Sequence, residues 1–205
     1  MVLLYALPVG LVLGLLLGGT LGALRNLRVR PLWIYVAITL QILAFPSGLL
    51  PLKTSDALAR VLWLISFGFL GLGAYANRHL VGVPVVALGM LLNVVAVCAN
   101  GGHMPVRPEA LAAISRDYDL HNNSINLAHP HLAWLVDRWA VPGWLPFGNV
   151  YSVGDVVIAL GGIVLIVAAM RPRLILGLAP QARGGAAQTG LDRPIPLGPP
   201  RHRSF

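Results

Sequence analysis

The sequence predicts an all-α integral membrane bundle of about five transmembrane helices, with an exoplasmic interfacial or re-entrant loop between the fourth and the fifth. The first observation behind this prediction is composition: 57% of the 205 residues are hydrophobic, only 11% are charged, and the mean hydropathy is +0.75. A water-soluble domain must cover its surface with polar groups, and this chain has too few of them. The second observation is that five apolar segments each approach the ~20 residues that a helix needs to cross a bilayer.

These segments are expected to be helices because a helix pairs all of its backbone groups internally where water is absent. They are Val2–Leu24, Leu32–Leu52, Ala57–Ala76, Val81–Ala99 and Ser152–Met170. The first is followed by arginines rather than by a small-residue cleavage site, so a cleaved signal peptide is not expected. Together the five segments predict a transmembrane bundle over residues 1–172.

Basic residues are distributed unequally between the two sets of connections, which predicts the orientation. Ten follow the first, third and fifth segments: Arg25, Arg28, Arg30, Arg78, Arg171, Arg173, Arg183, Arg193, Arg201 and Arg203. Five lie on the other side: Lys53, Arg60, Arg107, Arg116 and Arg138. Because short basic loops stay in the cytoplasm, we expect a bacterial plasma-membrane protein with its N-terminus outside and its C-terminus inside.

The same orientation accounts for the excess of fifteen basic over seven acidic residues without a nucleic-acid partner. The tail, residues 173–205, is rich in Gly, Pro, Ala and Arg and lacks apolar periodicity. It is expected to be disordered, cytoplasmic and held near anionic membrane lipids by its arginines.

Residues 100–151 form the long connection between helices and are expected on the exoplasmic side. Connections of this length are usually functional in compact domains. Pro108–Ile114 predicts a short helix with proline in its first turn, and His131–Trp139 predicts an amphipathic one. Several tryptophans in the loop suit a membrane interface, so we expect the loop to fold back onto the membrane.

Glycine recurs every four residues in the first segment, at Gly10, Gly14, Gly18 and Gly22. Such a row lets another helix approach closely, which matters in lipid because helices there associate mainly through packing. Two interpretations are open: a contact with another helix of the same chain, or docking of other membrane subunits through the first helix.

Polar residues inside the apolar segments are few, and the most informative are Gln41, Asn93 and Asn100. A polar group at membrane depth faces the interior of a bundle, as an interhelical hydrogen bond or as part of a functional site. Asn100 is followed by Gly101 and Gly102, a pattern that ends a helix in left-handed geometry. Asn100 therefore has both a capping interpretation and a functional one.

Four histidines of the loop raise the question of a metal site: His103, His121, His129 and His131. The HxxxH and HExxH spacings that place two ligands on one helical face are missing. Haem ligation is no better supported, since these histidines lie in a loop rather than on facing helices. We expect no metal and no cofactor, and the stretch DYDLHNNS is expected to be a solvated turn.

Asp137 and Asp155 lie eighteen positions apart, with Asp155 at the start of the fifth segment. Ser152 with Asp155 is typical of a capping box, in which a hydroxyl and a carboxylate satisfy free amides at a helix N-terminus. The alternative is that the loop folds back and brings Asp137 against Asp155, so that one keeps its proton and the pair can catalyse acid–base hydrolysis. In that alternative Asn100 orients the substrate.

Several short segments carry a family resemblance. They are Leu92–Asn93, the NGGHMPV run at Asn100–Val106, the LVD run at Leu135–Asp137 and the SVGD run at Ser152–Asp155. These segments resemble a family of uncharacterised bacterial multi-pass membrane proteins, known only as a domain of unknown function, over most of residues 1–170. The resemblance implies no established activity.

A second resemblance is local. The stretch LVDRWAVPGWLPFGNVYSVGDVVIALG, residues 135–161, resembles the C-terminal part of the lipoprotein signal peptidases, which are membrane aspartic peptidases. Asp137 and Asp155 match their two catalytic aspartates, and Gly154 stands where that family has alanine. This resemblance implies an aspartic-type hydrolase that acts on amides near the outer lipid headgroups.

Two functional hypotheses follow, both built on a polar cluster of Asn100, Asp137 and Asp155 at the outer membrane surface. In the first, which we favour at this point, the cluster locks the loop onto the bundle and the chain is a small accessory or structural subunit of a membrane complex. In the second, the two aspartates are catalytic and Asn100 supports them. Whether the chain is an enzyme is left open by the sequence.

Overall fold

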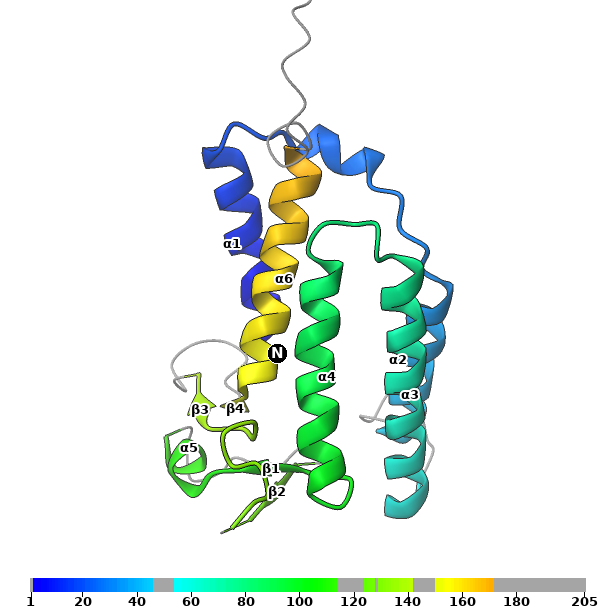
Figure 1. Cartoon of the computed structure of the whole chain (residues 1–205), viewed down its shortest axis with the longest axis vertical. Helices are drawn as coiled ribbons and strands as arrows, with labels where there is room; N and C mark the ends of the chain where they lie inside the picture. Colours follow the sequence, from blue (N-terminus) through cyan, green and yellow to red (C-terminus); the bar gives the residue numbers. More distant parts are fainter. Residues whose placement is uncertain (1, 46–53, 114–123, 128, 142–149, 172–205) are drawn as a thin grey trace, which may run out of the picture.

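The computed structural model describes residues 2–45, 54–113, 124–127, 129–141 and 150–171. This part of the chain is mostly helical, as expected for the all-α class, with short strands at one end (Figure 1). Helices lie in all five expected segments: α1 (Val2–Leu16), α2 (Leu32–Ala44), α3 (Asp56–Ala76), α4 (Val83–Ala99) and α6 (Val153–Met170). By length and composition α3 and α6 are long and apolar enough to cross a membrane, whereas α1, α2 and α4 are apolar but shorter.

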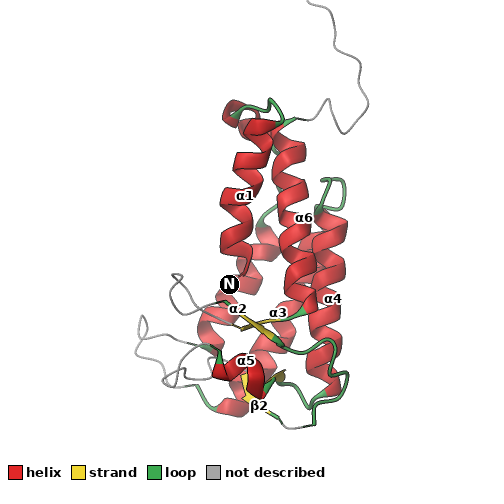
Figure 2. Ribbon diagram, turned by 90° about the vertical axis from the view of Figure 1, so that its left-hand side faces the viewer, coloured by secondary structure: helices red, strands yellow, loops and turns green. Residues whose placement is uncertain are grey.

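The helices run side by side along the long axis of the molecule (Figures 1 and 2). Helix α6 packs against both α1 and α4, and α2 packs against α3. The chain reverses direction from each helix to the next, so the connections alternate between two ends. We call the end that carries the strands the loop end, and the opposite end, where α1 and α6 finish, the arginine end.

Helix α1 is shorter than the expected helix Val2–Leu24, which is therefore wrong in its length. It ends at Leu16, and a separate 3-10 helix, η1 (Leu21–Asn26), follows. Gly18 has a φ of +78°, which is left-handed geometry. The N–H groups of Gly18 and Gly19 donate to carbonyls of the last turn of α1, as in a glycine-terminated helix.

Helices α4 and α6 pack closely through glycines spaced seven residues apart, Gly82 and Gly89 facing Gly161 and Gly154. A Cβ atom at Gly89 would lie 2.6 Å from the carbonyl oxygen of Gly154, and one at Gly161 would lie 2.7 Å from the amide nitrogen of Val86. Neither helix can therefore accept a larger residue at these positions without moving apart. Small residues that allow backbones to approach are the usual basis of helix packing in lipid.

A hydrogen bond from Gln41, the polar residue of the second expected segment, joins α2 to α3. The amide nitrogen Nε2 of Gln41 donates to the hydroxyl of Ser66 at 3.1 Å, and that hydroxyl donates to the carbonyl of Trp63 at 2.6 Å. Ser66 is fully buried. This interhelical hydrogen bond is one of the two interpretations that the sequence left open for Gln41, and it gives the buried hydroxyl of Ser66 a partner away from water.

The loop end is built from short strands and one short helix. Strand β1 (Met104–Val106) pairs in parallel with β2 (Ser124–Asn126), and β3 (Trp139–Ala140) pairs antiparallel with β4 (Val150–Tyr151). The short helix expected near Pro108 is confirmed as α5 (Pro108–Ala112), with proline in its first turn. Because β4 leads directly into α6, this small fold is tied to the bundle.

The amphipathic helix expected at His131–Trp139 is wrong. Residues 131–135 form turns, and the chain then becomes extended. Leu135, Val136 and Asp137 are buried in succession, which a helix with one exposed face does not allow. The expected turn at DYDLHNNS falls almost entirely on residues that the structure does not describe, and the expected basic tail, residues 173–205, lies outside the described residues altogether.

Candidate functional site

Asp155 is held at the start of α6 by a complete capping box. The backbone N–H of Asp155 donates to the hydroxyl of Ser152 at 3.1 Å, and the backbone N–H of Ser152 donates to Oδ2 of Asp155 at 3.1 Å. Ser152 is fully buried. The capping box predicted from the sequence is confirmed, and it fixes the carboxylate at the positive end of the helix dipole.

Asn93 adds a third contact to Asp155 from the neighbouring helix. Its Nδ2 donates to Oδ1 of Asp155 at 3.0 Å, and its Oδ1 accepts from the hydroxyl of Ser152 at 2.8 Å. A Cβ atom at Gly154 would collide with this same Oδ1 and would lie 2.7 Å from the carbonyl oxygen of Gly89. Gly154, which stands where the lipoprotein signal peptidases have alanine, therefore leaves the space that the Asn93 side chain fills.

Asp137 is placed by its backbone rather than by a helix. Its N–H donates to the carbonyl of Pro105 at 3.0 Å, and its carbonyl accepts from the N–H of Arg107 at 2.9 Å. The next residue, Arg138, donates its N–H to the carbonyl of Tyr151 at 3.2 Å. Asp137 thus lies where the β1 segment meets the strand pair that leads into α6, and it is 6% exposed.

The environment of Asp137 raises the pKa of its carboxyl group from 3.8 to about 7. Burial is the largest cause, because the charged form loses its hydration, and the negative charge of Asp155 is the second. The structure therefore brings the two predicted aspartates close enough for their charges to interact. At neutral pH such a pair contains one carboxyl group that readily holds a proton and a second one, Asp155, that accepts hydrogen bonds from two N–H donors, of Asn93 and of the Ser152 backbone.

Asn100 caps α4 and ties the loop to it. Gly101 follows with a φ of +68°, so the left-handed helix end predicted from the sequence is confirmed. The Nδ2 of Asn100 donates to the carbonyls of Ala96 at 2.7 Å and His131 at 2.9 Å, and its Oδ1 accepts from the N–H of His131 at 2.8 Å. Its amide is occupied by backbone groups, so within the described residues it anchors the loop instead of contacting an aspartate.

The loop histidines that the structure describes do not gather around a common point. No three His, Cys, Asp or Glu side chains among the described residues are arranged to hold a metal ion. His103 instead contacts Arg60 of α3, with Nη1 2.7 Å from Nε2. Because a guanidinium only donates, Nε2 of His103 accepts in this contact. His121 lies outside the described residues.

The glycine row of the first segment is divided in the structure. A Cβ at Gly10 would lie 3.0 Å from Cδ1 of Ile166, and a Cβ at Gly14 would collide with the side chain of Met170, so both glycines face α6 of the same chain. Gly18 ends α1, and Gly22, in η1, has nothing within 4 Å. The internal contact is thus made by two of the four glycines.

Two parts of the site were missed by the sequence reasoning: the role of Asn93 as a bridge between Ser152 and Asp155, and the glycines of α4 and α6. The equal spacing of Gly82 to Gly89 and of Gly154 to Gly161 was a usable signal. It predicts two helices that meet along one line. With α4 and α6 in contact, Asn93 is forced toward the start of α6.

The chain is similar to proteins whose function is unknown. Residues 26–167 match the model of a family of unknown function (DUF5317). An uncharacterized protein of Thermotoga maritima is 31% identical over 144 residues, which cover 68% of this chain and 77% of that protein. No solved structure matches the chain. The family match covers well over half of the sequence, and the chain therefore belongs to the family of unknown function DUF5317.

Proposed function

We propose that this chain is a multi-pass protein of the bacterial plasma membrane, with five spanning helices, its N-terminus outside and its C-terminus in the cytoplasm. The length and apolar composition of α3 and α6 support this location. The orientation is supported by Arg25, in the last turn of η1, and by Arg171, which follows α6 at the arginine end, as the positive-inside rule expects of a cytoplasmic face. The loop end then lies at the outer surface.

We further propose that Asp137 and Asp155 form an acid–base site that hydrolyses an amide bond near the outer lipid headgroups. The observation that carries this proposal is the burial of Asp137 beside Asp155, which raises its pKa to about 7. Strongly perturbed carboxyl groups next to a specific charged partner are concentrated at catalytic sites. The local resemblance to the lipoprotein signal peptidases involves the same two residues.

The energy of the arrangement favours chemistry over a purely structural role. Keeping Asp137 ionised in the folded protein costs about 4 kcal/mol relative to the unfolded chain, from the rise of its pKa from 3.8 to about 7. An asparagine would fill the same space without that penalty. A carboxyl group at this position is therefore explained more directly by proton transfer than by packing.

The proposed reaction divides the work between the two carboxyl groups. Asp155 removes a proton from water as the water oxygen attacks the amide carbon, and Asp137 gives its proton to the carbonyl oxygen. The tetrahedral intermediate collapses with cleavage of the C–N bond: the proton that Asp155 took from water passes to the leaving nitrogen, and Asp137 takes back a proton from a hydroxyl group of the intermediate. Asn93 and Ser152 keep Asp155 oriented during both steps through the hydrogen bonds described above.

The test compares Asp137→Asn and Asp155→Asn with Glu109→Gln, an exposed acid of the same loop end that serves as the matched control. Each variant replaces the wild type in cells that otherwise lack the protein, and membrane proteins are searched by mass spectrometry for unprocessed chains. We expect an unprocessed membrane substrate to accumulate with both aspartate variants and not with Glu109→Gln. Folded aspartate variants whose membrane proteome equals the wild type's would rule the hydrolase out.

A second candidate is the accessory or structural subunit, in which the loop end only locks the bundle. The double hydrogen bond from Asn100 to the backbone of His131 supports it, because this contact holds the loop to α4. In this case Asn100→Ala and Asp155→Asn both lower protein abundance and melting temperature, and no substrate accumulates with either. The two candidates therefore differ in the proteome of a well-folded variant.

A further inference from the structure

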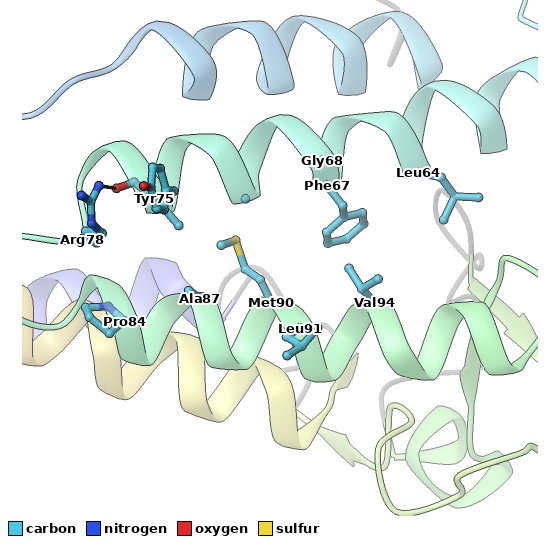
Figure 3. A pocket seen from close by; sticks show the side chains of 12 residues that line it. Leu64, Phe67, Gly68, Tyr75, Arg78, Pro84, Ala87, Met90, Leu91 and Val94 are labelled. Carbon is cyan, nitrogen blue, oxygen red and sulfur yellow. Dashed lines mark hydrogen bonds between the residues drawn. The ribbon is translucent and has the colours of Figure 1, made fainter.

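A groove of about 560 Å³ lies between α3 and α4 and has no assigned role (Figure 3). Its walls are apolar side chains from the two helices, among them Leu64 and Phe67 of α3 and Met90 and Val94 of α4. The site formed by Asp137 and Asp155 does not contribute to its lining. The groove is therefore a separate feature of the molecule.

Glycines of α3 leave this groove open although no protein neighbour requires them to be small. A Cβ atom at Gly68 or at Gly71 would meet nothing within 4 Å. By contrast, a Cβ at Gly73, on the face toward α2, would lie 3.0 Å from Ile34, and one at Gly89 would lie 2.6 Å from α6. The space above Gly68 and Gly71 is thus available to something other than this chain.

One end of the groove carries a positive charge. Arg78 is the one charged side chain among the described residues that line it. Its guanidinium carbon lies 4.1 Å from the centroid of the Tyr75 ring, and its Nη1 donates to the carbonyl of Tyr75 at 2.9 Å. A guanidinium has five N–H donors in a planar fork suited to phosphate, and Arg78 is exposed, so donors remain for an anion.

The surroundings of Arg78 reinforce the positive charge. Arg78 lies in the connection from α3 to α4, on the side of the bundle toward the arginine end, and the neighbouring Asn77 accepts from the backbone N–H of Arg30 at 2.7 Å. The acidic residues of the described part of the chain, Asp56, Glu109, Asp137 and Asp155, belong to elements at the loop end. An anion at Arg78 therefore meets no nearby negative charge among the described residues.

We propose that this groove binds one acyl chain of an anionic phospholipid of the inner leaflet, with the lipid phosphate held by Arg78. The inference rests on the proposed membrane location and is independent of the proposed hydrolysis. From Leu64 to Tyr75 the groove follows about 16 Å of helix, which is close to half of the ~30 Å hydrocarbon core that one leaflet supplies. Apolar walls suit the chain, and the arginine suits the headgroup.

The experiment uses the full chain purified in mild detergent, with native mass spectrometry to count retained lipids. Phosphatidylglycerol and phosphatidylcholine with identical acyl chains are added separately. Arg78→Gln removes the headgroup contact and Gly71→Leu fills the groove. The controls are Arg28→Gln, an exposed arginine at the same end, and Gly22→Leu, an exposed glycine outside the groove. Melting temperatures verify that every variant is folded.

We expect the wild type to retain phosphatidylglycerol in preference to phosphatidylcholine. Arg78→Gln should weaken phosphatidylglycerol binding about tenfold, as for the loss of one charge-assisted hydrogen bond. Gly71→Leu should abolish retention of both lipids, and the two controls should bind as the wild type does.

Three results would overturn the inference. The first is equal retention of the two lipids by the wild type, and the second is an equal loss of phosphatidylglycerol binding in Arg28→Gln and Arg78→Gln. The third is a lipid-free dimer that Gly71→Leu dissociates, because it would assign the groove to a second copy of the chain. Failure of the membrane location itself is distinguishable. A chain that alkaline washing removes from membranes contradicts the proposed function as well, whereas a membrane-embedded chain without lipid selectivity contradicts only this inference.

Discussion

Asp137 is buried near a second acid, and its raised pKa makes the stability of the folded protein depend on pH. This dependence can be measured separately from any catalysis. The pKa of its carboxyl group is about 7 in the folded protein and 3.8 in the absence of these surroundings. Between these two pH values the folded state binds a proton that the unfolded state has released. The free energy of unfolding therefore falls as pH rises through this range.

Asp137→Asn should remove this dependence. Below about pH 4 the protonated Asp137 is neutral, and the variant and the wild type are expected to be similar in stability. As the pH rises to about 8, the wild type should lose up to about 4 kcal/mol relative to the variant, because its carboxyl group ionises while buried. The measurement is the melting temperature in detergent across this pH range.

Glu109→Gln is the control for this comparison, since Glu109 is an exposed acid at the same end. Its melting temperature should follow the wild type's at every pH. A difference between Asp137→Asn and wild type that does not change with pH would mean that Asp137 is ionised throughout. The same titration verifies that Asp137→Asn is folded at neutral pH, which the catalytic test requires.

At the scale of elements, the contact between α4 and α6 determines the geometry of the site. A Cβ at Gly89 would lie 2.6 Å from the carbonyl oxygen of Gly154, and a Cβ at Gly154 would lie 2.7 Å from the carbonyl oxygen of Gly89. This close approach brings Asn93 within hydrogen-bonding distance of Asp155 and Ser152. A change of one methyl group at the contact is therefore expected to disturb the polar cluster as well as the packing.

Gly154→Ala tests this expectation. The new methyl group would collide with Oδ1 of Asn93 and with the backbone of Gly89, so the helices must separate, at a cost of about 1–3 kcal/mol for overpacking. Gly71→Ala is the matched control, because its Cβ enters open space and alanine favours a helix by up to about 1 kcal/mol over glycine. Thermal unfolding of both variants provides the comparison, and equal stability of the two would contradict the packing argument.

Helices were predictable where local signals and hydrophobicity agreed. The Ser152 and Asp155 capping box begins α6 where the sequence places it, and α3 begins after Ser55, whose hydroxyl accepts from the N–H of Leu58. The end of α1 was missed because hydrophobicity continues past the turn at Gly18. When the length of a helix is inferred from the length of an apolar run, a change of backbone geometry inside that run goes undetected.

The loop end was the least predictable region, for a physical reason. Its conformation depends on pairing between segments distant in sequence, such as the N–H of Asp137 with the carbonyl of Pro105. The spacing of apolar residues over a short segment contains no information about such distant partners. The spacing in His131–Trp139 fits an amphipathic helix, although the segment forms turns and an extended stretch. The sequence could suggest that Asp137 and Asp155 belong to one site, but their proximity required the fold.

On the scale of the whole molecule, basic and acidic side chains are distributed unequally between the two ends of the bundle. The described arginines on the side of the arginine end come from three places: the connection between α1 and α2, the connection between α3 and α4, and the end of α6. Described acids lie at the opposite end, and Arg60 there contacts His103 of the loop. Such an arrangement is expected of a bundle whose two ends face different sides of a membrane.

Single cysteines report this orientation directly. The native Cys98 is first replaced by Cys98→Ser, and then either Glu109→Cys or Arg28→Cys is introduced, both at exposed positions. In intact cells a membrane-impermeant maleimide should label the Glu109→Cys protein, whereas the Arg28→Cys protein should react only after permeabilisation. The reverse pattern would place the aspartate pair in the cytoplasm. Amides near the outer headgroups would then be out of reach, and Arg78 would face the outer leaflet.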